Sequence, residues 1–310
     1  MINLTINNLS HFMGSNKKSC SAFIKSNPEW KMKEVIKKTG INYIYESNKK
    51  EDVLELSYRS SSKTLKSFDK KKIDSIIVVT QTAISKLPSV SCILQDKLKL
   101  HKNIIAFDIN LGCSGFVYAL ATLYSFFLSN MTKNTLLICS DTYTKFLEHN
   151  NRTCKSVFSD SASSCIISKK NSNFSPKFNF FTDGSGSKDL LEKNNFIEMN
   201  GSSVFLFTIK TIPKLFKDLL KKNKLEIKDV DHFIFHQASK VVLDKLRVDL
   251  KIPSKKFHTN YNLIGNTTSA SIPILLEELI RKKKIKKNST LMLVGFGVGL
   301  SAACCVLRWE

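Results

Sequence analysis

Short apolar runs alternate with segments of helical spacing in the first half of the chain. Each run is apolar, partly β-branched and bounded by polar residues, which is typical of a strand covered on both faces of a sheet. The expected strands span residues 73–80, 104–107, 135–140 and 164–168, and the expected helices span 28–40, 51–65, 89–98 and a long apolar segment that begins at Phe116. This alternation predicts an α/β fold with helices on both faces of its sheet.

A polar tract rich in Asn, Ser and Gly follows at residues 169–200, and we expect it to form surface loops and to link two halves of the protein. The alternating pattern then returns. Strands are expected at 231–235, 290–294 and 302–308, and helices at 204–221, 239–250 and 269–282. We therefore expect an N-terminal half over residues 1–170 and a C-terminal half over residues 171–310.

The second half repeats the order of elements in the first. Three landmarks recur at a nearly constant offset of about 155 residues, which is typical of an internal duplication. The matched positions are Asp74 with Asp231, Cys113 with Asn266, and Thr135 with Thr290. We expect the two copies to pack about a pseudo-twofold axis.

Composition and charge narrow the class of function. With 310 residues, of which 42% are hydrophobic, the chain can bury a substantial core. The formal net charge of +22 comes mostly from dispersed lysines, without a basic motif interleaved with aromatic residues, so we do not expect nucleic-acid binding. An acidic protein partner is a better match for this charge, although the basic runs at 221–224 and 281–284 are equally consistent with solvated surface.

Export, membrane insertion and metal binding are not expected. No apolar stretch reaches the roughly 18 residues of a membrane span, and the N-terminus lacks the basic region and apolar run of a secretory signal. The eight cysteines show no paired metal-ligand spacing, and several lie in apolar strands. These patterns predict a cytoplasmic protein with free thiols and no metal.

Cys113 is the first candidate for chemistry. It lies in the small-residue turn LGCSG, between the strand at 104–107 and the helix that begins at Phe116. The unpaired N–H groups and the positive dipole end of a helix start favour the thiolate, which is the reactive form of cysteine. A buried structural cysteine would fit this stretch equally well.

The second half of the chain supplies two further candidates. Asn266 occupies the turn equivalent to that of Cys113, in GNTTSAS, and His236 follows the strand at 231–235. Taken alone, His236 would be an ordinary strand-end histidine and Asn266 an ordinary turn residue. A duplicated fold that brings equivalent strand ends together would place Cys, His and Asn in one pocket. A thiolate accepts acyl groups from thioesters, and a neutral imidazole and an amide NH₂ stabilise enolate charge.

Four motifs, DINLGCSGFVYAL, HQAS, GNTTSAS and GFGVGL, together with KTGI at residues 38–41, resemble those of the β-ketoacyl-acyl carrier protein synthase III family of thiolase-fold condensing enzymes. The resemblance implies a thiolase-like fold, in which internally duplicated βαβαβ halves form α-β-α-β-α layers. It also implies that Cys113 accepts the acyl group and that His236 and Asn266 bind the malonyl thioester carbonyl. The backbone N–H groups of Cys113 and Val298 would form the oxyanion hole.

The resemblance further implies contacts with the substrate. Phe158 and Phe205 match positions at the active-site entrance, Arg152 matches a residue that packs against the CoA adenine, and Lys38 is a candidate phosphate contact. Ser239 stands where the family usually has Asn, which alters a hydrogen bond to the pantetheine arm. Trp30 lies further from the KTGI motif than the family's adenine-stacking tryptophan, so it is assigned no role.

The expected activity is acyl loading from acyl-CoA or acyl-acyl carrier protein (acyl-ACP) onto Cys113, followed by decarboxylative condensation with malonyl-ACP in fatty-acid or specialised acyl-chain biosynthesis. The expected partners are the carrier protein, docking near Lys240, Lys245 and Arg247, and a second copy of the chain in a homodimer whose sheet continues across the subunit boundary. No cofactor is expected beyond the thioester substrates. The alternatives are acyl transfer to an amine or hydroxyl, for instance on a sugar or secondary metabolite, and a non-enzymatic binding protein. The donor's chain length is left open.

Overall fold

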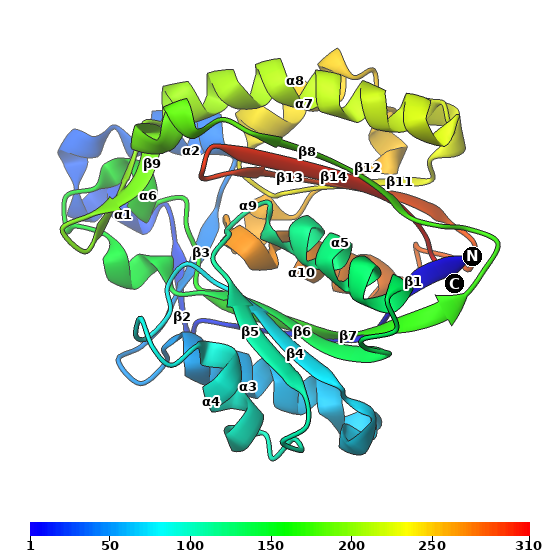
Figure 1. The fold of residues 1–310 in the computed structure, drawn as a ribbon. Helices are drawn as coiled ribbons and strands as arrows, with labels where there is room; N and C mark the ends of the chain where they lie inside the picture. The colour runs from blue at the N-terminus through cyan, green and yellow to red at the C-terminus, as the bar shows by residue number, and fades with distance from the viewer.

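The computed structural model describes residues 1–310. Two five-stranded sheets dominate it, and Figure 1 shows them stacked with helices between them and helices outside each of them. The first sheet has the order β1 (Ile2–Met13), β7 (Ser161–Asn171), β6 (Asn134–Asp141), β4 (Ser75–Val79) and β5 (Ile105–Ile109). The second has the order β8 (Lys177–Thr182), β14 (Ser301–Arg308), β13 (Thr290–Gly297), β11 (His232–Phe235) and β12 (Phe257–His258).

The two sheets are copies of one another, which confirms the predicted duplication. In each sheet the first two strands listed above pair antiparallel, the next pair is also antiparallel, and the last three strands run parallel. The matched aspartates also make the same contact. The carboxylate of Asp74 accepts the backbone N–H of Asn134 at the start of β6, and that of Asp231 accepts the N–H of Thr290 at the start of β13.

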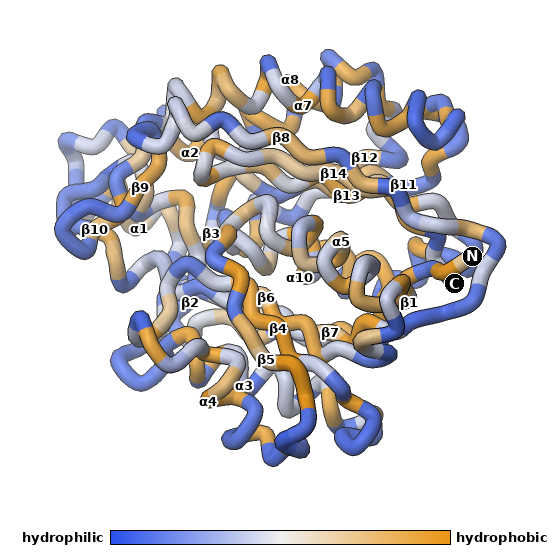
Figure 2. The backbone as a smooth tube through the Cα atoms, viewed as in Figure 1, coloured by the Kyte–Doolittle hydropathy of each residue, from blue (hydrophilic) through white to orange (hydrophobic).

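Three layers of helices cover these sheets. The helix pair α5 (Gly115–Leu128) and α10 (Ser271–Arg281) lies between them, α3 (Val53–Thr64) and α4 (Val90–Lys97) cover the first sheet, and α7 (Gly201–Asn223) and α8 (Lys240–Asp249) cover the second (Figure 1). Because α5 packs between two sheets, it is apolar on most of its surface, and Figure 2 shows the apolar positions concentrated in the sheets and the central pair. None of the helices is both long and apolar enough to span a bilayer.

The remaining elements are short, and Figure 1 shows most of them at the end of the molecule opposite the two chain termini. They are the strand pairs β2 (Asn16–Ser19) with β3 (Tyr43–Glu46) and β9 (Leu190–Lys193) with β10 (Phe196–Met199), and the helices α1 (Ala22–Ser26), α2 (Met32–Thr39), α6 (Arg152–Lys155) and α9 (Tyr261–Ile264). Several of these elements border the candidate active site described below.

The predicted strands and helices are present, with several differences, and the short elements β2, β3, β12, α1, α6 and α9 were not predicted. The segment 28–40 is a 3-10 turn followed by α2, because Lys31 adopts a left-handed conformation with a φ of 51°. The tract 169–200 is more than linker and loops, since it contains β8, an edge strand of the second sheet, and the β9–β10 hairpin. Strand β1 was not predicted. The run at 104–107 forms part of β5, which is an edge strand with half-buried residues rather than a fully buried strand. The boundary between residues 170 and 171 stays a prediction.

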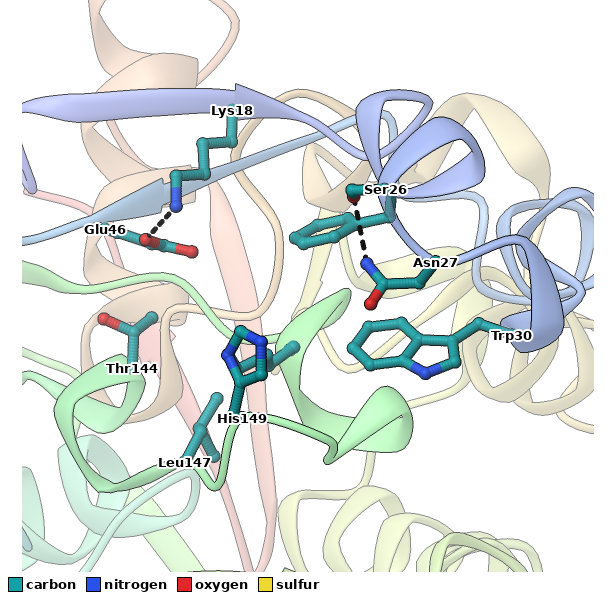
Figure 3. A pocket seen from close by; sticks show the side chains of 10 residues that line it. Lys18, Ser26, Asn27, Trp30, Glu46, Thr144, Leu147 and His149 are labelled. Atoms are coloured by element: carbon teal, nitrogen blue, oxygen red, sulfur yellow. Dashed lines mark hydrogen bonds and ion pairs between the residues drawn. The ribbon is translucent and has the colours of Figure 1, made fainter.

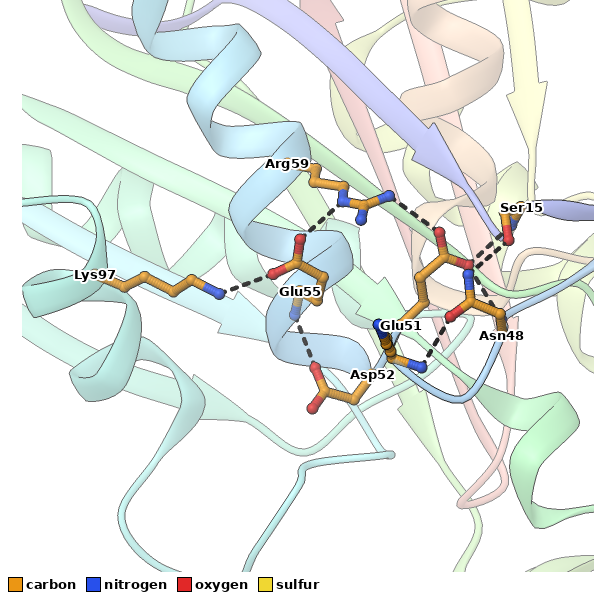
Figure 4. Close-up of polar contacts among 8 residues, drawn as sticks. Ser15, Asn48, Glu51, Asp52, Glu55, Arg59 and Lys97 are labelled. Carbon is orange, nitrogen blue, oxygen red and sulfur yellow. Dashed lines mark hydrogen bonds and ion pairs between the residues drawn. The ribbon is translucent and has the colours of Figure 1, made fainter.

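A buried carboxylate fastens the start of α3 to the chain that follows β1 (Figure 4). Glu51 is 1% exposed, and it accepts hydrogen bonds from the backbone N–H groups of Ser15 at 3.0 Å and Asn48 at 3.1 Å and from Arg59 Nη1 at 3.0 Å. Burial by itself would raise the pKa of Glu51, but these donors outweigh it and hold the pKa below its ordinary value. Glu51 is therefore a charged anchor of the first half.

Candidate active site

Cys113 lies in the turn between β5 and α5, as predicted. Leu111 N–H bonds the carbonyl of Ile109, and Gly115 N–H bonds that of Gly112, so the chain turns tightly around the cysteine. The end of β13 passes directly over it. A Cβ added to Gly297 would lie 3.0 Å from Cys113 Cβ and 3.2 Å from its Sγ, so a larger residue at position 297 would crowd the nucleophile. The N- and C-terminal halves are therefore in contact at the sulfur.

The thiol of Cys113 differs from the expectation. Burial raises its pKa above the ordinary value, and the negative charge of Asp141 raises it further. The helix start was expected to favour the thiolate, but desolvation acts in the opposite direction and outweighs it. Cys113 is consequently a neutral thiol.

His236 follows β11 and is almost completely buried. Its backbone N–H bonds the carbonyl of Val294, and its ring packs edge-on against Phe296 with centroids 5.4 Å apart. The Nδ1 atom lies 2.7 Å from Ser271 Oγ at the start of α10. Burial lowers the pKa of His236 to about 3, so the imidazole is neutral at physiological pH. This agrees with the neutral imidazole that the proposed chemistry needs.

Asn266 is held by the backbone of the neighbouring segment. Its N–H bonds the carbonyl of Val157 and its carbonyl accepts the N–H of Ser159, both at 2.8 Å. Its side-chain Oδ1 accepts the N–H of Thr268 at 2.9 Å, whereas its Nδ2 makes no hydrogen bond within the protein. The amide is thereby oriented with its NH₂ donor free.

Cys113, His236 and Asn266 line one cavity of about 870 Å³, which brings the three predicted side chains together. The cavity is also lined by Lys38, Arg152, Phe158, Phe205 and Ser239, so every predicted substrate contact borders it. Val298 is half-buried and lines a different, smaller cavity, while its neighbour Gly297 lines the large one. No cluster of three or more His, Cys, Asp or Glu side chains forms a candidate metal site.

Sequence reasoning missed Asp141, the buried last residue of β6. Its Oδ2 accepts the hydroxyls of Thr268 and Ser269 at 2.6 Å each, and its Oδ1 accepts the N–H of Gln81 at 2.8 Å. Asp141 thus ties the first sheet to the turn that carries Asn266. The signal that could have found it is its position, since an acid directly after a buried parallel strand lies at the edge where the candidate residues gather.

The comparisons with known proteins agree with this geometry. The family model described as 3-Oxoacyl-[acyl-carrier-protein (ACP)] synthase III matches residues 107–184, and its C-terminal counterpart matches residues 220–309. A beta-ketoacyl-[acyl-carrier-protein] synthase III of Acholeplasma laidlawii is 35% identical over 294 residues, which cover 93% of this chain and 92% of the relative. The chain belongs to the β-ketoacyl-ACP synthase III family.

Two further members of the family extend the comparison. The beta-ketoacyl-[acyl-carrier-protein] synthase III of Fusobacterium nucleatum is 32% identical over 307 residues, with 92% of each chain covered. A crystal structure of a 3-oxoacyl-(acyl-carrier-protein) synthase III matches with a TM-score of 0.95 at 27% identity and covers 99% of this chain and 100% of that one. The thiolase-like fold predicted from the motifs is therefore confirmed.

Trp30, to which the sequence assigned no role, does not line the catalytic cavity. Trp30 lines a separate cavity of about 260 Å³, together with His149, and stacks on Phe23 with ring centroids 6.1 Å apart (Figure 3). No residue lines both this cavity and the catalytic one. The two are linked by Arg152, which lines the catalytic cavity and donates from Nη1 to the carbonyl of Trp30 at 3.2 Å.

The three cations expected to dock the carrier protein lie on α8, outside the cavity lining. Lys240 and Lys245 are exposed, and each forms an ion pair with an aspartate one turn later, Asp244 and Asp249 respectively. Arg247 forms no ion pair. Part of the positive charge of this helix is therefore neutralised locally.

Proposed function

We propose that this protein is a β-ketoacyl-ACP synthase III that transfers an acyl group from an acyl-CoA or acyl-ACP onto Cys113 and condenses it with malonyl-ACP. The observation that carries the proposal is the meeting of Cys113, His236 and Asn266, from both halves of the chain, in one cavity. The product is a β-ketoacyl-ACP for fatty-acid or specialised acyl-chain biosynthesis.

In the loading step, Cys113 Sγ attacks the thioester carbonyl and the donor thiol leaves. Because burial keeps Cys113 protonated, its proton must depart as the carbon–sulfur bond forms, and it ends on the departing thiol. The carbonyl oxygen gains negative charge in this step. The backbone N–H groups of Cys113 and Val298 are the proposed donors to that oxygen.

In the condensation step, the malonyl group loses carbon dioxide and the electron pair of the broken bond forms an enolate on the thioester. The NH₂ of Asn266, which has no partner within the protein, and the Nε2–H of His236 donate to the enolate oxygen. The enolate carbon then attacks the acyl carbonyl on Cys113. The sulfur leaves as the thiolate and takes up a proton from solvent, which returns the free thiol.

The contact between His236 and Ser271 supports this assignment. If the Ser271 hydroxyl donates to Nδ1, the single proton of the neutral ring lies on Nε2, which would then be the nitrogen that donates to the substrate. The low pKa of His236 also prevents the ring from becoming a cation that would lose its proton to the enolate. His236 therefore acts as a hydrogen-bond donor rather than as an acid.

Entrance residues and α8 have separate proposed roles. Arg152 and Lys38 would contact the nucleotide and phosphate end of CoA, and Phe158 and Phe205 the pantetheine arm. Ser239, which begins the turn into α8, would contact the same arm with its hydroxyl. The α8 cations would receive an acidic carrier protein, with Arg247 contributing the most because it has no acidic partner.

A homodimer is the proposed assembly. Strand β5 ends the first sheet with every residue half-buried, so its outer edge is available to pair with a second copy. Two apolar residues of the loop after β4 support this proposal, since Ile84 is 43% exposed and Leu87 is 81% exposed. Light scattering at micromolar concentration should give twice the monomer mass, and a monomer mass would contradict the proposal.

Intact-protein mass spectrometry tests the proposed nucleophile. The wild type, incubated with acyl-CoA donors, should gain one acyl mass, and Cys113→Ala should gain none. Cys92→Ala is the matched control, because Cys92 is an exposed cysteine on α4, and it should load as the wild type does. An acyl adduct that persists in Cys113→Ala would refute the assignment.

A further inference from the structure

The turn that carries the proposed oxyanion donor Val298 is held by few hydrogen bonds. It joins β13 to β14 and consists of Val298, Gly299 and Leu300. Leu300 exchanges both of its backbone hydrogen bonds with Asp183, at 2.9 Å each. The N–H of Val298 has no partner within the protein, and its carbonyl accepts only the hydroxyl of Ser301, at 2.7 Å. The Ser301 hydroxyl is therefore the one hydrogen bond that fixes the backbone of Val298.

Ser301 is also bonded to the residue that follows the nucleophile. Ser114 Oγ lies 2.8 Å from Ser301 Oγ, and both side chains are buried. Because a carbonyl can only accept, the single hydroxyl proton of Ser301 is used on Val298, and Ser114 must be the donor in the bond between the two serines. Ser114 and Ser301 thus form a serine relay with one direction, from Ser114 through Ser301 to the Val298 carbonyl.

Ser114 uses its hydroxyl in an unusual way for its position. It is the N-cap residue of α5, where a serine usually accepts an N–H from the first turn of its own helix, but its side chain makes no such bond. The contact with Ser301 is possible because β13 passes close to the turn around Cys113. A Cβ added to Gly295 would lie 2.7 Å from the carbonyl oxygen of Cys113 and 2.7 Å from Ser114 Cα. The hydroxyl therefore connects the two halves of the chain instead of capping its helix.

The serine relay and the nucleophile hold opposite ends of the same peptide group. The N–H of Val298 belongs to the peptide between Gly297 and Val298. At one end of this peptide, Gly297 packs against Cys113 in the catalytic cavity. At the other end, Ser301 holds the Val298 carbonyl. The N–H of Cys113 also has no partner within the protein, so both proposed oxyanion donors are free to bond a substrate oxygen.

We propose that Ser114 and Ser301 are positioning residues that orient the Val298 N–H toward the carbonyl oxygen of the acyl group on Cys113. This inference rests on the proposed function, since it concerns the oxyanion that forms there. That oxygen gains negative charge twice, when Cys113 attacks the donor thioester and when the enolate attacks the acyl-enzyme. Decarboxylation places its charge on a different oxygen, that of the malonyl thioester. Loss of the serine relay should therefore slow both attacks on the acyl carbonyl and leave decarboxylation unchanged.

Acyl loading, carbon dioxide release and the condensation product, all measured on the full chain, test the proposal. Ser301→Ala removes both bonds of the serine relay and should slow loading by about tenfold. Once loaded, this variant should release carbon dioxide at the wild-type rate. More of its enolate should then take up a proton from solvent and leave as acetyl-ACP, because attack on the acyl carbonyl is slower. The ratio of acetyl-ACP to β-ketoacyl-ACP should rise by about tenfold.

Two further variants test the direction of the serine relay. Ser114→Ala leaves the bond from Ser301 to Val298 in place, so it should shift loading and the product ratio in the same direction by a smaller factor. It also covers the case in which Ser301→Ala fails to fold. The double variant should be no slower than Ser301→Ala, because Ser114 acts only through Ser301. Losses that add in the double variant would refute the relay.

Ser60→Ala is the matched control. Ser60 is a buried serine on α3 whose Oγ lies 2.8 Å from Ser164 Oγ and donates to the carbonyl of Ser10 at 3.0 Å, so it makes a similar pair of bonds away from the catalytic cavity. It should load and condense as the wild type does.

The inference and the proposed function can fail separately. Folded relay variants whose loading rate and product ratio match the wild type would refute the inference and leave the proposed function intact. Relay variants that slow carbon dioxide release as much as loading would also refute it, since that pattern indicates general damage to the site. A wild type that no donor acylates would refute the proposed function and this inference with it.

Discussion

Replacing Asp141 by asparagine should have two separable effects, one on stability and one on the thiol. Every hydrogen-bond partner of this carboxylate is a donor. The shortest bonds come from the hydroxyls of Thr268 and Ser269 to Oδ2 and from the backbone N–H of Gln81 to Oδ1. Such a set stabilises the ionised form, although burial raises the pKa of Asp141. An amide preserves the shape of the side chain but presents a donor to one side of this cluster.

The size of the first effect follows from the hydrogen bonds. The Gln81 N–H cannot rotate away, so the amide oxygen should take the Oδ1 position and the NH₂ should face the two hydroxyls. Bonds to a charged acceptor contribute about 1.5–3 kcal/mol each and neutral ones about 1 kcal/mol. The hydroxyls can rotate to accept from the NH₂, and removal of a buried charge offsets part of the loss. Asp141→Asn should therefore lower the unfolding free energy by about 1–3 kcal/mol.

The second effect of Asp141→Asn is an increase in the reactivity of the Cys113 thiol. The charge of Asp141 raises the pKa of Cys113, so its removal should lower that pKa and make alkylation by iodoacetamide faster at a given pH. The assays are denaturant unfolding and the pH profile of alkylation. A variant as stable as the wild type, or one whose alkylation profile moves to higher pH or stays in place, would refute the reasoning. Loosening of the site would also lower the pKa of Cys113 by exposing the thiol, so the two profiles are compared under conditions in which the variant is fully folded.

Three further predictions address other parts of the account. Because the pKa of Glu51 lies below the ordinary 4.5, the stability that its charge contributes is fully present above pH 4.5 and is lost as the pH falls through the lower folded-state pKa. Glu51→Gln should lower the unfolding free energy by about 1–3 kcal/mol at pH 7. It should also weaken the decrease of the unfolding free energy at acidic pH. Ser271→Ala, which removes the partner of His236 Nδ1, should spare acyl loading and slow carbon dioxide release from malonyl-ACP by about tenfold, and equal losses in both steps would argue against the tautomer assignment. Charge reversal at Lys240 and Arg247 should raise KM for malonyl-ACP, with an effect that shrinks as salt rises, and should leave KM for acyl-CoA unchanged; equal effects on both substrates would exclude α8 as the docking site.

The parts of the fold that were predicted correctly are those whose burial shows as an apolar run in the sequence. Strands β4 and β6 are covered on both faces, so each contains an unbroken run of four apolar residues, which predicts a buried strand. Strand β1 was missed because it has buried residues such as Leu4 and Ile6 among polar ones, with a bulge between Asn7 and Ser10 that breaks the alternation. Edge strand β8 was missed for a similar reason, since most of its residues are exposed to solvent.

The same distinction applies to the site. Cys113, His236 and Asn266 were found because a duplication placed them at equivalent strand ends, and the structure brings them to one cavity. The thiol pKa was misjudged because a helix start is visible in a sequence, whereas the burial of one sulfur and the distance to Asp141 are not.

The central claim is that Asn266 and His236 act on malonate only after Cys113 is loaded. The most direct measurement follows both acyl loading and carbon dioxide release from malonyl-ACP in the wild type, in Asn266→Ala and in the control Asn262→Ala, whose residue is exposed on α9. The account predicts that Asn266→Ala loads normally and releases carbon dioxide about a hundredfold to a thousandfold more slowly, while the control matches the wild type in both. A wild type that loads its acyl group but never decarboxylates malonate would contradict condensation and favour acyl transfer to an amine or hydroxyl.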